Sequence, residues 1–168
     1  MMLHHNDISV ESKHCLVLGA GGSSKTIVKA LIDGHAASFT IKNKSMENAL
    51  KIKTYAQAIS DIDIQIFDKA DIKFDLAINT TPLGMYQQDD KDNFFNIPIH
   101  QDSILIDLIY TPITRFFWKI KDNVKQSING LDMLIFQALK SIEIWTETTY
   151  NVGPKLDSIK KQLENVLC

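Results

Sequence analysis

The sequence predicts an α/β fold: a doubly wound, Rossmann-like parallel sheet with flanking helices, in a single domain. Two observations predict it. Short apolar runs alternate with amphipathic helical segments through short connections, which favours strand–helix–strand units with right-handed crossovers. The first apolar run ends in a glycine-rich turn that leads directly into a helix, as at the ligand-binding edge of doubly wound sheets.

Composition and length set the class of protein. The chain has 168 residues, 45% of them hydrophobic and 23% charged, which suits one globular domain. A net charge of −2 lacks the basic excess of a nucleic-acid-binding protein, and we expect no membrane span and no metal site. The start of the chain has no secretory pattern. Cys15 and Cys168 are the two cysteines, and we interpret them as reduced thiols of a cytoplasmic protein.

Hydrophobic periodicity assigns the elements along the chain. Strands are expected at 14–19, 38–43, 62–67, 75–79, 103–110 and 126–129. Helices are expected at 23–35, 45–59, 114–123, 130–146 and 154–166. The polar stretch 86–101 is expected to be a loop. Residues 1–12 are expected to form an N-terminal tail, residues 13–150 the Rossmann-like domain, and residues 151–168 a C-terminal helix that packs on the same domain.

The glycine-rich turn after the first strand is the first candidate site. Its residues are Gly19, Ala20, Gly21, Gly22, Ser23 and Ser24. Gly19 permits a tight turn, Gly21 lets the backbone approach a pyrophosphate, and Ser24 is small enough for helix and strand to pack. The unpaired N–H groups of the helix start favour a phosphate. The turn therefore predicts a dinucleotide site, and a strand-to-helix turn without a ligand is the alternative.

The end of the second strand indicates which dinucleotide binds. An NAD-binding fold usually has Asp or Glu there to hold the ribose 2′-hydroxyl. This chain has Lys42, Asn43, Lys44 and Ser45 instead. A cation beside two neutral hydrogen-bonding groups suits a 2′-phosphate, with Lys44 as a point charge. The pattern favours NADP, and the alternative is a solvated strand end with Ser45 as an ordinary helix N-cap.

Three further segments follow the remaining strands. The stretch Asn79-Thr80-Thr81-Pro82-Leu83-Gly84-Met85 follows the fourth strand, and Asp107 to Pro112, with Tyr110, ends the fifth. The stretch from Asn129 to Met133 leads into the long helix, and Gln137 lies one turn beyond Met133. Each segment taken alone is more often structural than functional, so their joint order carries the information.

Taken together, the segments GAGGSSK, NKS, NTTPLGM, DLIYTPITRFF and NGLDMLIFQALKSIEIW resemble the NADP-binding domain of shikimate dehydrogenases. Their order and spacing match from about Lys13 to Trp145. The resemblance implies NADP as cofactor and the reversible reduction of 3-dehydroshikimate to shikimate. It also implies a cytoplasmic enzyme of the shikimate pathway, which leads to chorismate and the aromatic amino acids.

The resemblance also implies roles for individual residues. The pyrophosphate would lie at Gly19, Ala20, Gly21, Gly22 and Ser23, and the 2′-phosphate at Asn43, Lys44 and Ser45. The family has Asn-Arg-Thr at the latter site, so Lys44 and Ser45 are conservative departures. Thr80, Leu108, Gly130 and Met133 would line the cofactor. Tyr110 and Gln137 would contact shikimate.

The family enzyme also has an N-terminal substrate domain, with a Ser-x-Ser clamp and a Lys–Asp pair near the reacting hydroxyl. We find no counterpart of these motifs, so no catalytic residue is assigned, and we interpret the chain as the cofactor half of such an enzyme. The missing half would belong to a truncated gene or to a separate N-terminal polypeptide. A second hypothesis is an NADP(H)-binding module without catalysis. A third is a related quinate/shikimate or methylene-tetrahydrofolate reductase, and the segments NTTPLGM and DLIY favour the shikimate group.

Overall fold

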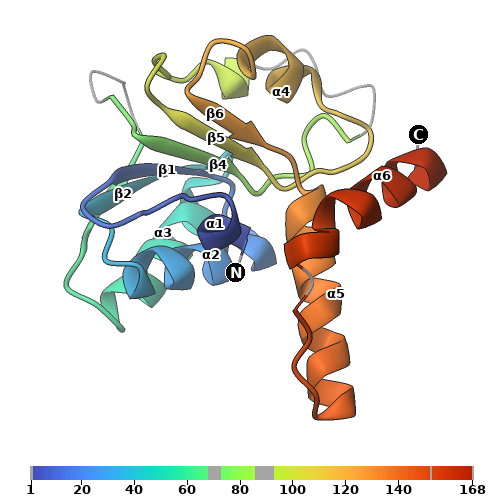
Figure 1. Cartoon of the computed structure of the whole chain (residues 1–168). Helices are drawn as coiled ribbons and strands as arrows, with labels where there is room; N and C mark the ends of the chain where they lie inside the picture. The colour runs from blue at the N-terminus through green and yellow to red at the C-terminus, as the bar shows by residue number, and fades with distance from the viewer. Residues whose placement is uncertain (1, 68–72, 86–92, 152, 168) are drawn as a thin grey trace.

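A six-stranded, all-parallel sheet forms the centre of the computed structural model, which describes residues 2–67, 73–85, 93–151 and 153–167 (Figure 1). The strand order is β3-β2-β1-β4-β5-β6. The strands are β1 (His14–Leu18), β2 (Ser38–Lys42), β3 (Asp63–Ile66), β4 (Leu76–Asn79), β5 (Ile104–Asp107) and β6 (Gln126–Ile128). The chain starts at the central strand, winds outward to β3 and then outward again to β6, so the predicted doubly wound α/β fold is confirmed.

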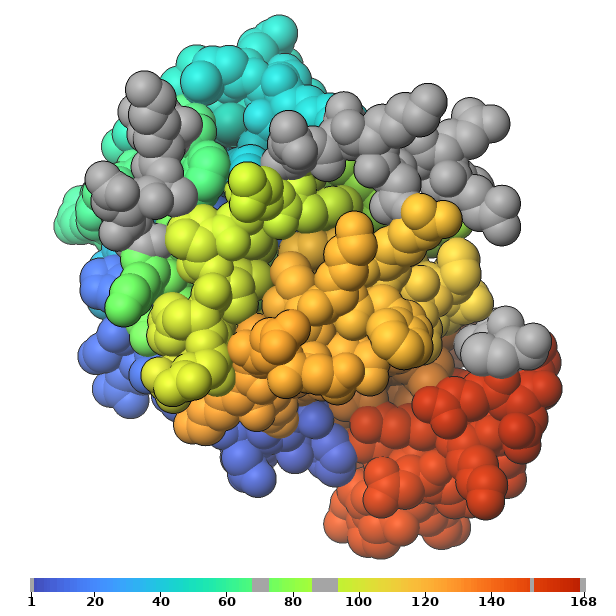
Figure 2. Space-filling model, turned by 90° about the horizontal axis from the view of Figure 1, so that it is seen from above, coloured from blue at the N-terminus to red at the C-terminus, as the bar shows by residue number. Residues whose placement is uncertain are grey.

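Helices cover both faces of this sheet. The helices are α1 (Met2–His5), α2 (Gly22–Asp33), α3 (Met46–Gln57), α4 (Arg115–Ile120), α5 (Leu131–Thr146) and α6 (Leu156–Leu167). Short 3₁₀ turns lie at η2 (Asn93–Phe95) and η3 (Gly153–Lys155). In Figure 1, α1, α2 and α3 lie below the sheet and α4 lies above it. The view from above shows η2, α4 and the neighbouring loops covering that second face (Figure 2).

The central strand explains the two layers of core. Successive side chains of a strand point to opposite faces. Cys15 and Val17 of β1 join the apolar cluster between the sheet and helices α2 and α3. Leu16 and Leu18 join the cluster between the sheet and α4 and η2. All four side chains are fully buried. A continuous apolar run is therefore what a strand covered on both faces requires.

The C-terminal helices form a third, smaller cluster at one side of the sheet. Leu156 of α6 is fully buried against Leu131 and Ile135 of α5. The Lys160 ammonium lies 2.5 Å from the Asp132 carboxylate, which is almost completely buried at the first turn of α5. These contacts join α6 to the part of α5 nearest the sheet. The far half of α5 projects away from the sheet (Figure 1).

The buried stripe of α5 differs from the one that periodicity predicts. Leu131, Ile135 and Leu139 are buried, as the helical spacing requires. The same helical spacing places Ile142 and Trp145 on this face, yet they are 43% and 79% exposed. The reason is that the far half of α5 extends past the sheet, so no described element covers that face.

The N-terminal segment is more ordered than its polar composition indicates. Residues 1–12 are expected to be a tail, but Met2–His5 form α1, and Ile8 and Val10 are buried in the cluster beside α2. Asn6 holds this segment in place: its side-chain amide donates to the Asp132 carboxylate, and its carbonyl accepts from Gln126. The boundaries at residues 12 and 150 remain a prediction.

Other boundaries differ by a few residues. The predicted strand 103–110 ends at Asp107, because the chain turns there to satisfy a buried carboxylate. Within the predicted loop 86–101, residues 93–95 form η2, and residues 86–92 lie outside the described part of the chain. Among the described residues, no helix has the length and apolar character needed to span a membrane.

The thiol of Cys15 gives a testable consequence of this core. Burial, together with the nearby Asp75 carboxylate, raises the pKa of Cys15 from 9.0 to about 12. In a Cys168→Ser variant, where Cys15 is the single thiol, we expect labelling by a thiol reagent at pH 8 at least ~100-fold slower than in the urea-unfolded chain. Because the folded-state pKa is raised, this thiol's contribution to stability is complete below pH 9 and is lost as the pH rises toward 12. Rapid labelling of the folded chain would contradict the burial of Cys15.

Candidate functional site

The carboxyl ends of the strands meet in one continuous row of backbone hydrogen bonds. The Gly19 amide donates to the Lys42 carbonyl of β2, and the Thr80 amide donates to the Leu18 carbonyl of β1. The Leu108 amide then donates to the Asn79 carbonyl of β4, and the Gly130 amide to the Ile109 carbonyl. This row joins the segments after β2, β1, β4, β5 and β6. The predicted site segments therefore lie along one edge of the sheet, where ligands bind in open α/β folds.

The glycine turn contains two kinds of glycine. Gly19 has φ of +108°, a conformation that favours glycine, and a Cβ atom there would lie 2.6 Å from Thr80 Oγ1. Gly21 has an ordinary extended backbone (φ −90°, ψ −164°), and neither Gly21 nor Gly22 has any atom within 4 Å of an added Cβ. The fold itself therefore requires glycine at 19, whereas Gly21 and Gly22 leave open space at the surface.

Helix α2 begins at this open space. Gly21 is its N-cap and supplies no side-chain hydrogen bond, so the backbone N–H groups of the first turn have no side-chain cap from that residue. Their aligned dipoles favour an anion at this end of the helix. Ala20 is half-buried and Ser23 is exposed beside the turn, while Ser24 is fully buried between helix and sheet. The turn can hold a phosphate through backbone N–H groups.

The two lysines at and after the end of β2 point to different surroundings. Lys42 turns away from the glycine turn: its ammonium lies 4.3 Å from the centre of the Phe67 ring and donates to the Asn96 carbonyl. Burial lowers the pKa of Lys42 below its ordinary value. Lys44 is exposed on the following loop. Of the two cations, Lys44 is therefore the one that remains a candidate for a 2′-phosphate.

Asn43 and Ser45 shape the loop that carries Lys44. The Asn43 side-chain amide donates to the Ser45 carbonyl at 2.9 Å. The Ser45 hydroxyl accepts from the Asn48 amide, so Ser45 is the N-cap of α3. Ser45 is therefore a helix N-cap, as the alternative interpretation of this segment predicts. A hydroxyl that accepts one hydrogen bond can also donate its proton to a ligand. The start of α3 adds a second helix N-terminus beside Lys44.

A buried polar network holds the ends of β4 and β5 together. Asp107 is fully buried and accepts hydrogen bonds from the Asn79 side chain (2.9 Å), the Ile109 amide (3.1 Å) and the Thr114 hydroxyl (2.5 Å). Burial raises the pKa of Asp107, and these three hydrogen bonds oppose the rise. The side-chain oxygen Oδ1 of Asn79 in turn accepts from the amide and hydroxyl of Thr81. One carboxylate thereby fixes the turns after both strands.

Close backbone packing brings the β5 loop against the start of α5. A Cβ atom on Gly130 would lie 2.0 Å from the Leu108 carbonyl oxygen, so this crossing admits only glycine. Tyr110, two residues along the same loop, is half-buried and packs on the cluster formed by Leu131, Ile135 and Leu156. The predicted cofactor residues Leu108 and Gly130 and the predicted substrate residue Tyr110 are therefore adjacent.

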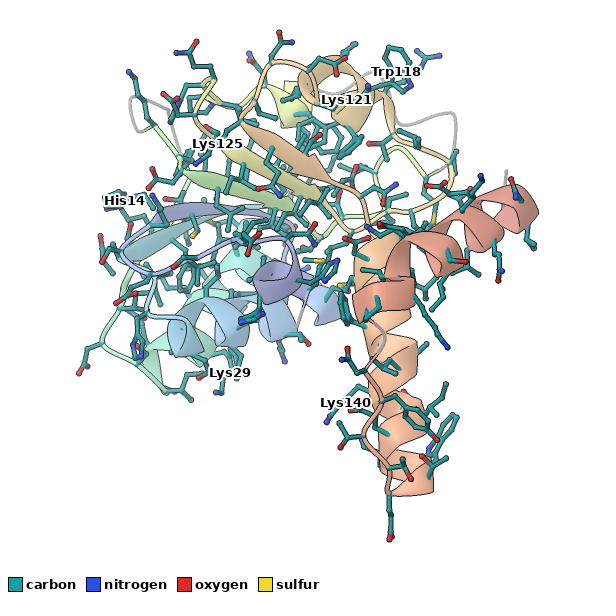
Figure 3. The ribbon with its side chains drawn as sticks, viewed as in Figure 1. His14, Lys29, Trp118, Lys121, Lys125 and Lys140 are labelled. Atoms are coloured by element: carbon teal, nitrogen blue, oxygen red, sulfur yellow. The ribbon has the colours of Figure 1, made fainter. Side chains whose placement is uncertain are left out.

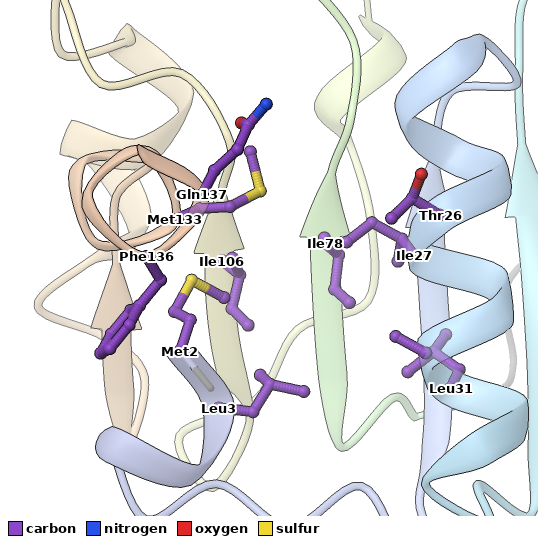
Figure 4. A pocket seen from close by; sticks show the side chains of 11 residues that line it. Met2, Leu3, Thr26, Ile27, Leu31, Ile78, Ile106, Met133, Phe136 and Gln137 are labelled. Carbon is purple, nitrogen blue, oxygen red and sulfur yellow. The ribbon is translucent and has the colours of Figure 1, made fainter. Parts of the chain in front are cut away.

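An apolar cavity of about 320 Å³ lies between α1, α2 and α5 (Figure 4). Figure 4 shows Met133 and Gln137 projecting into it from α5, opposite Thr26 and Ile27 of α2. Its lining residues are Met2, Leu3, Thr26, Ile27, Ala30, Leu31, Ile78, Ile106, Met133, Phe136 and Gln137. The structure thus brings the two predicted α5 residues, Met133 and Gln137, to one cavity beside β4 and β5.

The sequence did not indicate that α1 contributes to this cavity. Met2 and Leu3 line it from a segment expected to be a tail. The alternation of Ile8 and Val10 was the available signal, because two apolar residues spaced by two fit a chain that runs along a covered surface. In the described part of the chain, no three His, Cys, Asp or Glu side chains are grouped closely enough to hold a metal ion.

The curated proteins that resemble this chain carry the same name, shikimate dehydrogenase (NADP(+)). No protein-family model matches the chain. A shikimate dehydrogenase (NADP(+)) of Clostridium beijerinckii is 35% identical over 159 residues, covering 87% of this chain and 53% of that protein. The corresponding protein of Methanosphaera stadtmanae is 34% identical over 167 residues, covering 92% of this chain and 56% of that protein. The chain thus spans about half the length of the curated relatives it matches.

The structural comparison agrees. The crystal structure of shikimate 5-dehydrogenase from Listeria monocytogenes, in complex with shikimate and NAD, superimposes with a TM-score of 0.79 at 25% identity. The match covers 96% of this chain and 59% of that protein. Sequence and fold therefore agree on the family and on the portion of it that is present. The chain belongs to the shikimate dehydrogenase family and corresponds to its Rossmann-like half.

Proposed function

We propose that this chain is the NADP-binding half of a shikimate dehydrogenase that interconverts 3-dehydroshikimate and shikimate in the cytoplasm. The observation that carries the proposal is the open space at Gly21 and Gly22. Their backbone conformation suits any residue, and no neighbour restricts their side chains. Glycine at both positions is explained by a ligand that approaches the backbone closely, as a pyrophosphate does at a helix N-terminus.

NADP fits the end of β2 better than NAD does. The loop offers Lys44, the Ser45 hydroxyl and the Asn43 side chain, and it has no carboxylate at the position that holds a ribose 2′-hydroxyl in NAD sites. A 2′-phosphate would gain a cation and two neutral hydrogen-bonding groups. The curated relatives are named for NADP(+), whereas the Listeria enzyme was crystallised with NAD, and titration of the Lys44→Ala variant measures the preference of this chain.

The remaining residues would orient the reactants. When bound, the nicotinamide supplies or accepts the hydride. Leu108, Gly130 and Met133 would line its side of the cleft, and Tyr110 and Gln137 would offer a phenol and an amide to the hydroxyl and carboxylate groups of shikimate. Asp107, the acid beside them, is buried and already accepts three hydrogen bonds, so we assign it no proton transfer. The acid–base residues would come from a substrate domain outside this sequence.

The far half of α5 is where we expect that substrate domain to dock. Ile144 and Trp145 are 67% and 79% exposed there, two helical turns beyond Gln137. Exposed apolar side chains of this size indicate an interaction surface, since a second domain would remove them from water. The second candidate function is an NADP(H)-binding module that never meets such a domain. It is favoured by the site itself, which offers Tyr110 and Gln137 to substrate and no catalytic pair in the described residues.

Direct binding and turnover measurements distinguish these functions. The chain is titrated with NADPH and with NADH by nucleotide fluorescence, and the absence of binding to both would overturn the cofactor assignment. Shikimate-dependent and quinate-dependent reduction of NADP⁺ are then assayed with the chain alone. We expect no turnover, and clear turnover would show that the catalytic pair lies within this chain. Activity restored by an added substrate domain of a relative would favour the enzyme over the binding module.

Changing Lys44 to alanine tests the choice of nucleotide. We expect the dissociation constant for NADPH to rise about 5- to 30-fold, because a charge-assisted contact to the 2′-phosphate contributes about 1–2 kcal/mol at a partly exposed site. The dissociation constant for NADH, which lacks that phosphate, should change less than twofold. Lys42→Ala is the matched control, since Lys42 points toward Phe67. An equal loss of both nucleotides in the Lys44 variant would contradict the 2′-phosphate role.

A further inference from the structure

We infer that Ser24 and Thr80 are a coupled pair of positioning residues that hold the glycine turn in its pyrophosphate-binding geometry. The inference rests on the proposed NADP site. It assigns a function to the buried Ser24 hydroxyl and the half-buried Thr80 hydroxyl, since the resemblance implies only that Thr80 lines the cofactor. Thr80 would act on the cofactor through the turn and not by donating a hydrogen bond to it.

The hydrogen bonds of Thr80 lead to this assignment. Its hydroxyl donates to the Leu18 carbonyl at 2.7 Å, and its backbone amide donates to the same carbonyl at 2.8 Å. A carbonyl only accepts, so the single hydroxyl proton of Thr80 is used in this bond. The Ser24 hydroxyl lies 2.7 Å from Thr80 Oγ1, and Ser24 must therefore be the donor. Thr80 has no proton left to offer a ligand.

The direction of these bonds links three elements. Ser24 belongs to the first turn of α2, Thr80 follows β4, and Leu18 is the last residue of β1. The two hydrogen bonds, from Ser24 to Thr80 and from Thr80 to the Leu18 carbonyl, therefore fix the N-terminus of α2 relative to β1 and β4. Ser24 is fully buried, so its hydroxyl would be costly to leave unpaired.

Steric contact reinforces the same link. A Cβ atom on Gly19 would lie 2.6 Å from Thr80 Oγ1 and 2.9 Å from Thr81 Cγ2. The glycine turn and the β4 turn thus touch directly, and the side chain of Thr80 sets how closely they approach. The N–H groups at the start of α2 can meet a pyrophosphate only if this spacing is kept, because hydrogen bonds weaken steeply with distance and angle.

Four variants test the pair: Thr80→Val, Thr80→Ser, Ser24→Ala and the double variant Ser24→Ala/Thr80→Val. Valine keeps the size of threonine and removes both hydrogen bonds, whereas serine keeps the hydroxyl. We expect the NADPH dissociation constant to rise about tenfold in Thr80→Val and in Ser24→Ala, and to stay within about twofold in Thr80→Ser. The double variant should bind about as weakly as either single variant, because the two hydroxyls act as one unit.

The readouts separate this inference from the proposed function. Each titration is run where circular dichroism shows the variant to be folded, so a stability loss alone cannot move the dissociation constant. If the unchanged chain binds NADPH and both single variants bind it equally well, the positioning pair is wrong and the NADP site stands. Additive losses in the double variant would show independent residues. If the unchanged chain fails to bind NADPH, the proposed function itself is wrong.

Discussion

Gly130→Ala is expected to lower the free energy of unfolding by about 3 kcal/mol, the upper end of the usual cost of overpacking a core. The added methyl group would lie 2.0 Å from the Leu108 carbonyl oxygen and 2.5 Å from its carbon. Both are backbone atoms of the loop after β5, so no side chain can rotate away. The fold can accept the methyl group only by separating the start of α5 from that loop.

The separation would also strain the polar network behind the loop. The loop is held by the Gly130 amide bond to the Ile109 carbonyl and by the Asp107 carboxylate, which accepts from the Ile109 amide. Urea unfolding followed by circular dichroism measures the loss. Gly22→Ala is the matched control, because an added Cβ there meets no atom within 4 Å. A Gly130→Ala variant within about 1 kcal/mol of the unchanged chain would contradict the close packing.

The second large effect is expected on binding, at Gly21. Gly21→Asp should raise the stability of the fold and abolish most of the affinity for NADPH. Gly21 already has the extended backbone of a helix N-cap, where Asp is among the preferred residues, so the free energy of unfolding should rise by about 0.5–1 kcal/mol. The same carboxylate would stand where we propose the pyrophosphate, and two like charges in contact cost roughly 3 kcal/mol, about 100-fold in affinity.

The test is specific because Gly21→Asp is expected to raise the stability of the fold while it lowers the affinity for NADPH. Gly21→Asn is the matched variant, because asparagine caps a helix as well as aspartate does and carries no charge. We expect its NADPH affinity to fall less than that of Gly21→Asp, which separates the charge from the bulk of the side chain. Urea unfolding and nucleotide fluorescence supply the two readouts. A Gly21→Asp variant that binds NADPH normally would show that the pyrophosphate lies elsewhere.

Local signals were sufficient to predict the sheet and the segments that line its carboxyl edge. The apolar run around Leu16, the glycine turn and the residues that end each strand are short-range features, and the parallel order follows from chirality and short connections. The same signals brought Gly19, Thr80, Leu108 and Gly130 to one edge, as the backbone hydrogen bonds between neighbouring strand ends show. The sheet could be predicted without knowing any contact between residues far apart in the sequence.

Long-range contacts decided what the sequence could not. Lys42 and Lys44 both flank Asn43 and cannot be told apart from the sequence. In the structure the Phe67 ring and the Asn96 carbonyl, far along the chain, hold the Lys42 ammonium. The N-terminal segment is ordered by Gln126 and Asp132, more than a hundred residues later. The use of the Thr80 proton depends on Leu18 and Ser24. Periodicity and motif carry no information on such pairings.

The two tryptophans on the exposed surfaces of α4 and α5 determine the intrinsic fluorescence of the protein in solution. The chain has two tryptophans, and both lie at the surface: Trp118 on α4, beside Lys121 (Figure 3), is 62% exposed, and Trp145 on α5 is 79% exposed. Indole emission shifts to shorter wavelength when water is removed from the ring. Intrinsic fluorescence will therefore respond weakly to unfolding of the core and strongly to anything that covers α5. Trp145 therefore gives the chain a built-in fluorescent probe for any protein or domain that covers the far half of α5.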